Sequence, residues 1–71
     1  MSSPNVLVVE DEPQMRRFLR TTLAGNGYTV REAATAEEAL RLAASWNPEL
    51  VLLDLGLPDL DGLEFTRRLR E

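Results

Sequence analysis

The chain alternates short apolar runs with amphipathic stretches, and this alternation constrains the fold more than any other feature. Residues 6–9 and 50–53 are unbroken apolar runs, whereas residues 28–33 alternate between apolar and polar side chains. Unbroken runs are typical of strands covered on both faces, and alternation suits a strand with one solvated face. The stretches between them carry apolar residues at helical spacings. The sequence therefore predicts an α/β fold with the element order βαβαβα.

The expected elements have recognisable boundaries. We expect strands at about residues 5–10, 28–33 and 50–54, and helices at about residues 13–25, 36–46 and 61–71. Pro13 suits the first turn of a helix, and Thr35 with Glu38 has the spacing of a capping box. Right-handed crossovers would place the three parallel strands in the spatial order 2-1-3, with helices on both faces of the sheet.

Acidic residues follow two of these strands directly. Glu10 and Asp11 come after the first strand, and Asp54 comes after the third. In open α/β sheets, ligands bind beyond the carboxyl ends of the strands. If the two strands are neighbours, three carboxylates meet at this edge, where their repulsion is costly unless a cation binds. Mg²⁺ prefers oxygen ligands and keeps several waters, so the sequence predicts a magnesium site here.

Each group of acids also has an interpretation that needs no metal. Acids beside Pro13 would be favoured by the dipole of the following helix, so Glu10, Asp11 and Glu12 could serve as helix caps. Asp54 could hydrogen-bond to the loop that follows it. That loop contains Gly56, which lets a backbone approach a ligand closely.

Composition narrows the function classes. The chain has 71 residues, a net charge of −4, no histidine and no cysteine, so any metal would be held by oxygen. All eight basic residues are arginines, and we expect the two groups at residues 16–20 and 67–70 to be solvated helix surface. The acidic balance argues against nucleic-acid binding by these residues. No apolar run approaches the roughly 18 residues of a membrane span, and we expect a cytoplasmic protein.

Two segments carry a resemblance to a known family. They are VLVVEDE at residues 6–12 and LLDLGLPDLDG at residues 52–62. Their sequences and spacing resemble the receiver domain of bacterial response regulators, which has a flavodoxin-like (CheY-like) fold. The resemblance implies two-component phosphorelay signalling, in which a sensor histidine kinase is the partner and Mg²⁺ the cofactor.

The resemblance also assigns roles to individual residues. It implies that Asp54 accepts the phosphoryl group and binds the metal, and that Asp11 is a direct metal ligand. Glu10 would act largely through water, and the backbone carbonyl of Gly56 would be a further ligand. The domain would be a regulatory phospho-acceptor and not an enzyme.

Finer resemblances point to the output of the pathway. The DLGLPD variant at residues 54–59, with RRFLR at residues 16–20, is most similar to winged-helix (OmpR/PhoB-class) transcriptional regulators of the Kdp potassium-response type. The family normally adds a Ser or Thr after a fourth strand and a Lys after a fifth. Residues 1–71 match only the N-terminal part of a receiver. We therefore expect the remaining receiver and the DNA-binding domain to be absent, with little switching by this chain alone.

Two alternative functions stay open. One is a Mg²⁺-dependent aspartate phosphohydrolase, although such enzymes commonly carry a second Asp where this chain has Gly56. The other is a non-signalling interaction module that associates with itself. The apolar strand at residues 50–53 would lie at a sheet edge, and open edges invite pairing with another chain. We therefore expect self-association, with no membrane partner and with DNA binding only through an absent domain.

Overall fold

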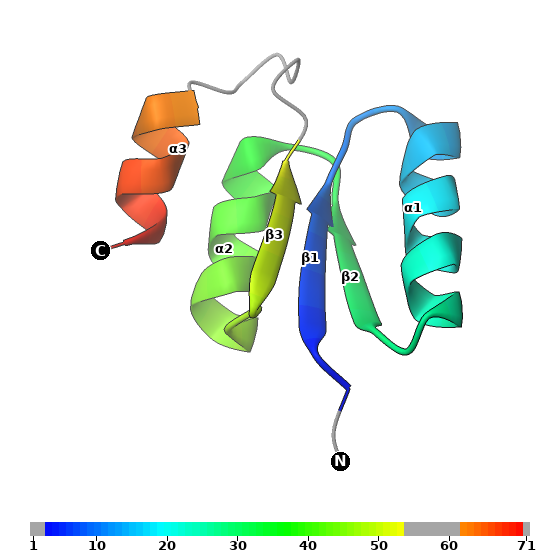
Figure 1. The fold of residues 1–71 in the computed structure, drawn as a ribbon. Coiled ribbons are helices and arrows are strands. Elements are labelled where there is room, and N and C mark those ends of the chain that lie inside the picture. Colours follow the sequence, from blue (N-terminus) through cyan, green and yellow to red (C-terminus); the bar gives the residue numbers. More distant parts are fainter. Residues whose placement is uncertain (1–2, 54–61, 71) are drawn as a thin grey trace.

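Three parallel strands form a sheet with helices on both of its faces (Figure 1). The computed structural model describes residues 3–53 and 62–70. Its elements are β1 (Asn5–Val9), α1 (Pro13–Gly25), β2 (Thr29–Ala33), α2 (Ala36–Trp46), β3 (Leu50–Leu53) and α3 (Gly62–Leu69). The sheet order is β2-β1-β3, which confirms the predicted α/β topology. In Figure 1, α1 covers one face, while α2 and α3 lie on the other.

The strand register places the carboxyl ends of the strands side by side. Both neighbours of β1 run parallel to it, and Val9 pairs with Ala33 on one side and with Leu53 on the other. The chain therefore leaves the sheet at the same level from all three strands. This arrangement is the geometric condition for acids that follow β1 and β3 to act together.

The main core lies between the sheet and the helix pair α2 and α3. Six buried residues form it: Leu7, Val9, Ala33, Ala36, Ala39 and Phe65. Small alanines on α2 let that helix approach the sheet closely, and the ring of Phe65 brings α3 onto the same cluster. Val6 and Val8 alternate with these positions along β1 and are also fully buried, so β1 is covered on both faces.

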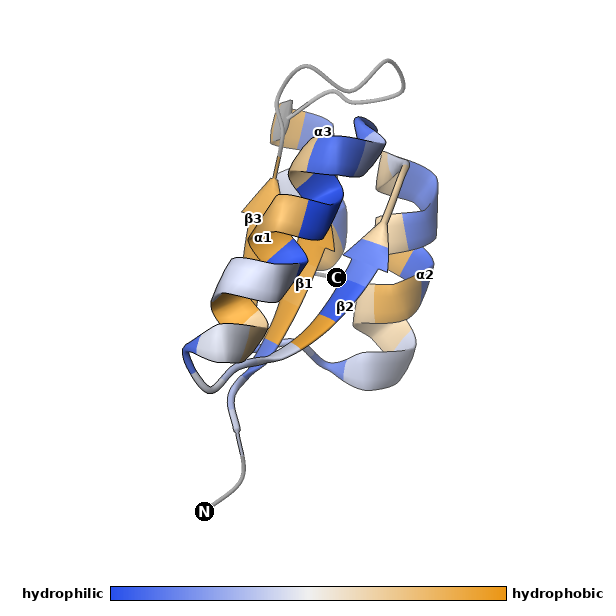
Figure 2. Cartoon of the chain, turned by 90° about the vertical axis from the view of Figure 1, so that its right-hand side faces the viewer, coloured by the Kyte–Doolittle hydropathy of each residue, from blue (hydrophilic) through white to orange (hydrophobic). Residues whose placement is uncertain are grey.

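Figure 2 shows that β1 and β3 are hydrophobic over most of their length, whereas much of β2 is hydrophilic. In β2, the exposed residues Thr29 and Arg31 alternate with the partly buried Val30 and Glu32. The patterns of β1 and β2 agree with their positions, because β1 lies between two neighbours and β2 lies at an edge. β3 is hydrophobic although it also lies at an edge of the described sheet.

β1 and β2 are shorter than predicted, because a backbone group at one end of each predicted strand forms a hydrogen bond outside the sheet. β1 ends at Val9 and not at Glu10, whose carbonyl oxygen accepts a hydrogen bond from Arg16 Nη1 at 3.0 Å. β2 begins at Thr29 and not at Tyr28, whose backbone N–H donates to the carbonyl oxygen of Leu23 at the end of α1. Both groups are thereby taken out of the strand ladder.

The last helix is also shorter than predicted. α3 ends at Leu69, and Arg70 lies in a turn in which its N–H donates to the carbonyl oxygen of Arg67, three residues earlier. A tighter bond of this kind often closes the last turn of a helix. The predicted helix limits at residues 61 and 71 lie outside the described residues.

The start and end of α2 follow from local sequence. Thr35 Oγ1 accepts a hydrogen bond from the N–H of Glu38 at 3.1 Å, as the capping-box spacing predicts. The Glu38 carboxylate accepts from the N–H of Ala34 at 2.8 Å and so ties the preceding loop to the helix. At the other end, Asn47 has a left-handed φ of 52°, which stops the helix before Pro48.

The face of the sheet beneath α1 is only partly covered. A hollow of about 290 Å³ lies between α1 and β3, lined by Val9, Glu10, Leu19, Leu52 and Leu53. The exposed large apolar side chains include Phe18 at 61% and Leu50 at 49%. In the described part of the chain, no helix is long and apolar enough to cross a membrane.

Candidate metal and phosphoryl-acceptor site

Of the predicted site residues, the structure describes Glu10 and Asp11, whereas Asp54 and Gly56 lie outside the described residues. Glu10 and Asp11 directly follow β1, at the edge of the sheet where Val9 and Leu53 are paired. Leu53 is the last described residue before Asp54 in the sequence. The register places the end of β1 beside the end of β3, and the proximity of Asp54 to Glu10 and Asp11 stays a prediction.

Glu12, the third acid of the loop, caps α1. Its carboxylate accepts hydrogen bonds from the N–H groups of Gln14 at 3.1 Å and Met15 at 2.7 Å. The N–H groups in the first turn of a helix have no partner within the helix. Glu12, at the N-cap position before Pro13, therefore stabilises the start of α1. The capping interpretation is thus correct for Glu12, which is committed to the helix and not to a ligand.

Glu10 is held by its backbone on both sides. Its N–H donates to the carbonyl oxygen of Ala33 at 3.0 Å, and its own carbonyl oxygen accepts from Arg16. The Glu10 carboxylate accepts a hydrogen bond from the N–H of Glu12 at 3.2 Å. The loop therefore turns tightly around residue 11, and the chain direction after β1 is closely defined.

Asp11 differs from its neighbours. It is exposed, and within residues 3–53 and 62–70 its side chain makes no hydrogen bond or ion pair. An acid in a defined loop that has no partner within these ranges is suited to binding an external cation. The candidate ligands in this loop are carboxylates, and oxygen ligands fit Mg²⁺ and not a metal that prefers nitrogen or sulfur. Across the described ranges, no three acids are grouped closely enough to form a complete site.

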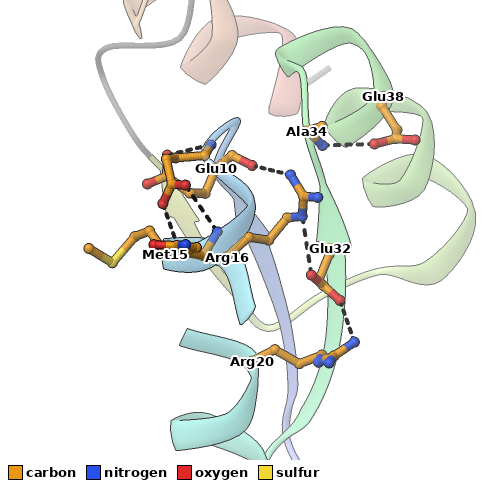
Figure 3. A network of polar contacts seen from close by, with 9 residues as sticks. Glu10, Met15, Arg16, Arg20, Glu32, Ala34 and Glu38 are labelled. Atoms are coloured by element: carbon orange, nitrogen blue, oxygen red, sulfur yellow. Dashed lines mark hydrogen bonds and ion pairs between the residues drawn. The ribbon is translucent and has the colours of Figure 1, made fainter. Parts of the chain in front are cut away.

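The prediction that the arginines are simply solvated is wrong for Arg16. Its Nε lies 3.2 Å from Glu32 Oε1, and Arg20 Nη1 lies 3.0 Å from the other Glu32 oxygen (Figure 3). The same Arg16 guanidinium donates to the Glu10 carbonyl oxygen, so it connects the acidic loop to the edge strand β2. The available sequence signal was weak: Arg16 and Arg20 share a helix face, and Glu32 falls on the inward-facing register of an alternating strand.

Comparison with known proteins agrees with this geometry. The model of the response regulator receiver domain family matches residues 6–71. The KDP operon transcriptional regulatory protein KdpE of Escherichia coli is 58% identical over 67 residues, which cover 94% of this chain and 30% of that protein. The response regulator MprA of Mycobacterium ulcerans is 47% identical over 68 residues, covering 96% of this chain and 29% of that protein.

Solved receiver structures share the fold. The response regulator TrrA of Thermotoga maritima, in complex with Mg²⁺-BeF, is 40% identical with a TM-score of 0.86; the match covers 94% of this chain and 58% of that one. The chemotaxis response regulator CheY4 of Vibrio cholerae is 32% identical with a TM-score of 0.90, covering 97% of this chain and 57% of that one.

The matches cover different shares of the relatives. This chain spans about a third of the length of the curated relatives and somewhat more than half of the solved receiver chains. The predicted resemblance to the receivers of winged-helix-class regulators of the Kdp type is confirmed. The chain belongs to the response regulator receiver domain family.

Proposed function

We propose that this chain is the metal-binding and phosphoryl-accepting part of a receiver whose complete protein regulates transcription in the cytoplasm. A sensor histidine kinase would supply the phosphoryl group, and Asp54 would accept it. The proposal rests on the position of Asp11, which has no side-chain partner among the described residues, beside Glu10, beyond paired strand ends and in a chain of this family. DNA binding would belong to a separate domain outside residues 1–71.

The chemistry follows from the residue types. An Asp54 carboxylate oxygen would attack phosphorus and form an acyl phosphate, while the bond from phosphorus to the donor's histidine nitrogen breaks. When bound, Mg²⁺ would neutralise charge on the transferring group. We assign Asp11 as a direct ligand, Glu10 as an acid acting through water, and the Gly56 carbonyl as a further ligand. The Mg²⁺-BeF complex of TrrA supports the choice of metal.

We propose a regulatory role and not a phosphohydrolase role. The relatives named above are transcriptional regulators and response regulators. Aspartate-based phosphohydrolases commonly place an acid/base Asp two residues after the nucleophile, and here that position is Gly56. Glycine has no side chain, so residue 56 can neither protonate a leaving oxygen nor activate a water molecule for hydrolysis.

The metal requirement can be tested in a form of the chain extended to a complete receiver domain. With acetyl phosphate as donor, we expect phosphorylation to need Mg²⁺ and to stop when a chelator removes it. Loss of an outer-shell partner alone costs about 10- to 100-fold in metal affinity, so Asp11→Asn should lower the rate at subsaturating Mg²⁺ at least about tenfold.

The matched control for this test is Glu37→Gln, which removes an equal charge from an exposed residue of α2. It should leave the Mg²⁺ dependence unchanged. Equal rates for Asp11→Asn and the wild type at every Mg²⁺ concentration would contradict the assignment of Asp11.

We also propose that the 71-residue chain associates with itself. β3 lies at a sheet edge in the described structure, and Phe18 and Leu50 expose apolar surface on the partly covered face. Pairing of β3 with a strand of a second chain, or exchange of helices or strands between chains, would cover this edge and this apolar surface. Sedimentation at high micromolar concentration should reveal dimers or larger species. A monomer that unfolds cooperatively under these conditions would rule out the association.

A further inference from the structure

We propose that Arg16 is a positioning residue for the magnesium site, a role that rests on the proposed function. Arg16 lies on the first turns of α1 and is not itself a candidate ligand, because a guanidinium has no acceptor atom. It acts on the backbone that carries the ligands. Its Nη1 donates to the carbonyl oxygen of Glu10, the residue that connects β1 to Asp11.

Arg16 is suited to this role because its guanidinium makes two directed contacts at once. While Nη1 bonds to Glu10, Nε pairs with Glu32 Oε1 at 3.2 Å on β2. The planar fork of an arginine holds both partners in one geometry, which a lysine ammonium cannot do. Glu32 in turn is held by Arg20 through its second oxygen, so the orientation of Arg16 is fixed from both sides (Figure 3).

Burial separates this network from ordinary surface ion pairs. The side chains of Arg16 and Glu32 are only 24% and 25% exposed, whereas Arg41 and Glu37 on α2 form a pair in which both are largely exposed. Exposed pairs contribute little because water screens them and their side chains lose entropy on ordering. A partly buried, bridging arginine is a more rigid support for the loop that presents Asp11.

The positioning role predicts an effect opposite in sign to that of simple electrostatics. A nearby positive charge repels Mg²⁺, so if charge alone mattered, removing Arg16 would tighten metal binding. If Arg16 positions Glu10 and Asp11, its removal lets the loop relax and weakens binding despite the lost repulsion. The neighbouring Arg17 is exposed and has no partner among the described residues, so Arg17→Ala is a control for charge.

The test is an Mg²⁺ titration of the 71-residue chain, in which the NMR signal of the Asp11 backbone amide reports binding. Thermal unfolding of each variant establishes that it is folded at the temperature of the titration. We expect Arg16→Ala to bind Mg²⁺ about tenfold more weakly, in the range found for outer-shell partners. Arg16→Lys, which keeps the charge but loses the fork, should bind about threefold more weakly. Arg17→Ala should bind as the wild type does, or more tightly.

The outcomes separate this inference from the proposed function. If the wild type binds no Mg²⁺, or if Asp11→Asn binds it equally well, the metal site itself is wrong. If Asp11→Asn loses binding while folded Arg16→Ala binds as tightly as Arg17→Ala, only the positioning role is overturned. Should Arg16→Ala fail to fold, wild-type affinity in Arg16→Lys would overturn the role instead.

Discussion

Replacing Phe65 with alanine is expected to remove about a third or more of the free energy of unfolding of the chain. Phe65 is 3% exposed and joins α3 to the core formed with Leu7, Val9 and the alanines of α2. Large-to-small changes of a buried phenylalanine cost about 3–5 kcal/mol. A domain of this size has a total free energy of unfolding of about 4–10 kcal/mol. The variant therefore loses a third or more of its stability.

Thermal unfolding followed by circular dichroism measures this loss. For a domain this small, each kcal/mol lowers the Tm by about 4–8 °C, so Phe65→Ala should lower it by about 12 °C or more. The control is Leu63→Ala in the same helix, because Leu63 is 86% exposed and should change stability by less than about 0.5 kcal/mol. Equal shifts for the two variants would mean that α3 does not pack through Phe65.

The topology could be predicted because the apolar patterns of the strands and the rule for crossovers lead to the same arrangement. The unbroken apolar runs define β1 and β3, the alternating run defines β2 as an edge, and right-handed crossovers then leave one strand order. The strand ends could not be predicted in the same way. β1 ends early because Arg16 takes the Glu10 carbonyl, and β2 starts late because Tyr28 closes α1. Both depend on contacts between elements.

The position of the acids after β1 could be predicted, but the contacts that hold their loop could not. Glu10 and Asp11 were predicted as site residues because they follow an apolar strand, a position defined by sequence alone, and their roles stay predictions. The sequence could not show which of the three acids caps α1, because Glu10, Asp11 and Glu12 all precede this helix. The structure shows that Glu12 does. Arg16 and Glu32 were missed because they are 16 residues apart, on different elements. Their meeting depends on how α1 lies against β2.

The second large effect is expected from Asp54→Asn, which should abolish phosphoryl uptake in a complete receiver that carries this sequence. A carboxylate oxygen is nucleophilic and can form an acyl phosphate, whereas the neutral amide of asparagine cannot. The substitution also removes one negative charge from the proposed metal site. Asp11, in contrast, should affect the rate because it binds Mg²⁺, and it should not act as the nucleophile that bonds to phosphorus.

Asp59→Asn is the matched control for this variant. Asp59 lies in the same sequence segment and carries the same charge, but the proposed function gives it no part in the transfer. It should therefore take up phosphate at a rate close to that of the wild type. Loss of phosphorylation in both variants would point to general disruption of the segment.

The most direct measurement is mass spectrometry of the extended receiver after incubation with Mg²⁺ and acetyl phosphate. We expect the wild type to gain the mass of one phosphoryl group, the peptide containing Asp54 to carry it, and hydroxylamine to release it as from an acyl phosphate. Asp54→Asn should show no gain. A phosphoryl group on the Asp54→Asn variant at the wild-type level, or on another residue of the wild type, would contradict the account.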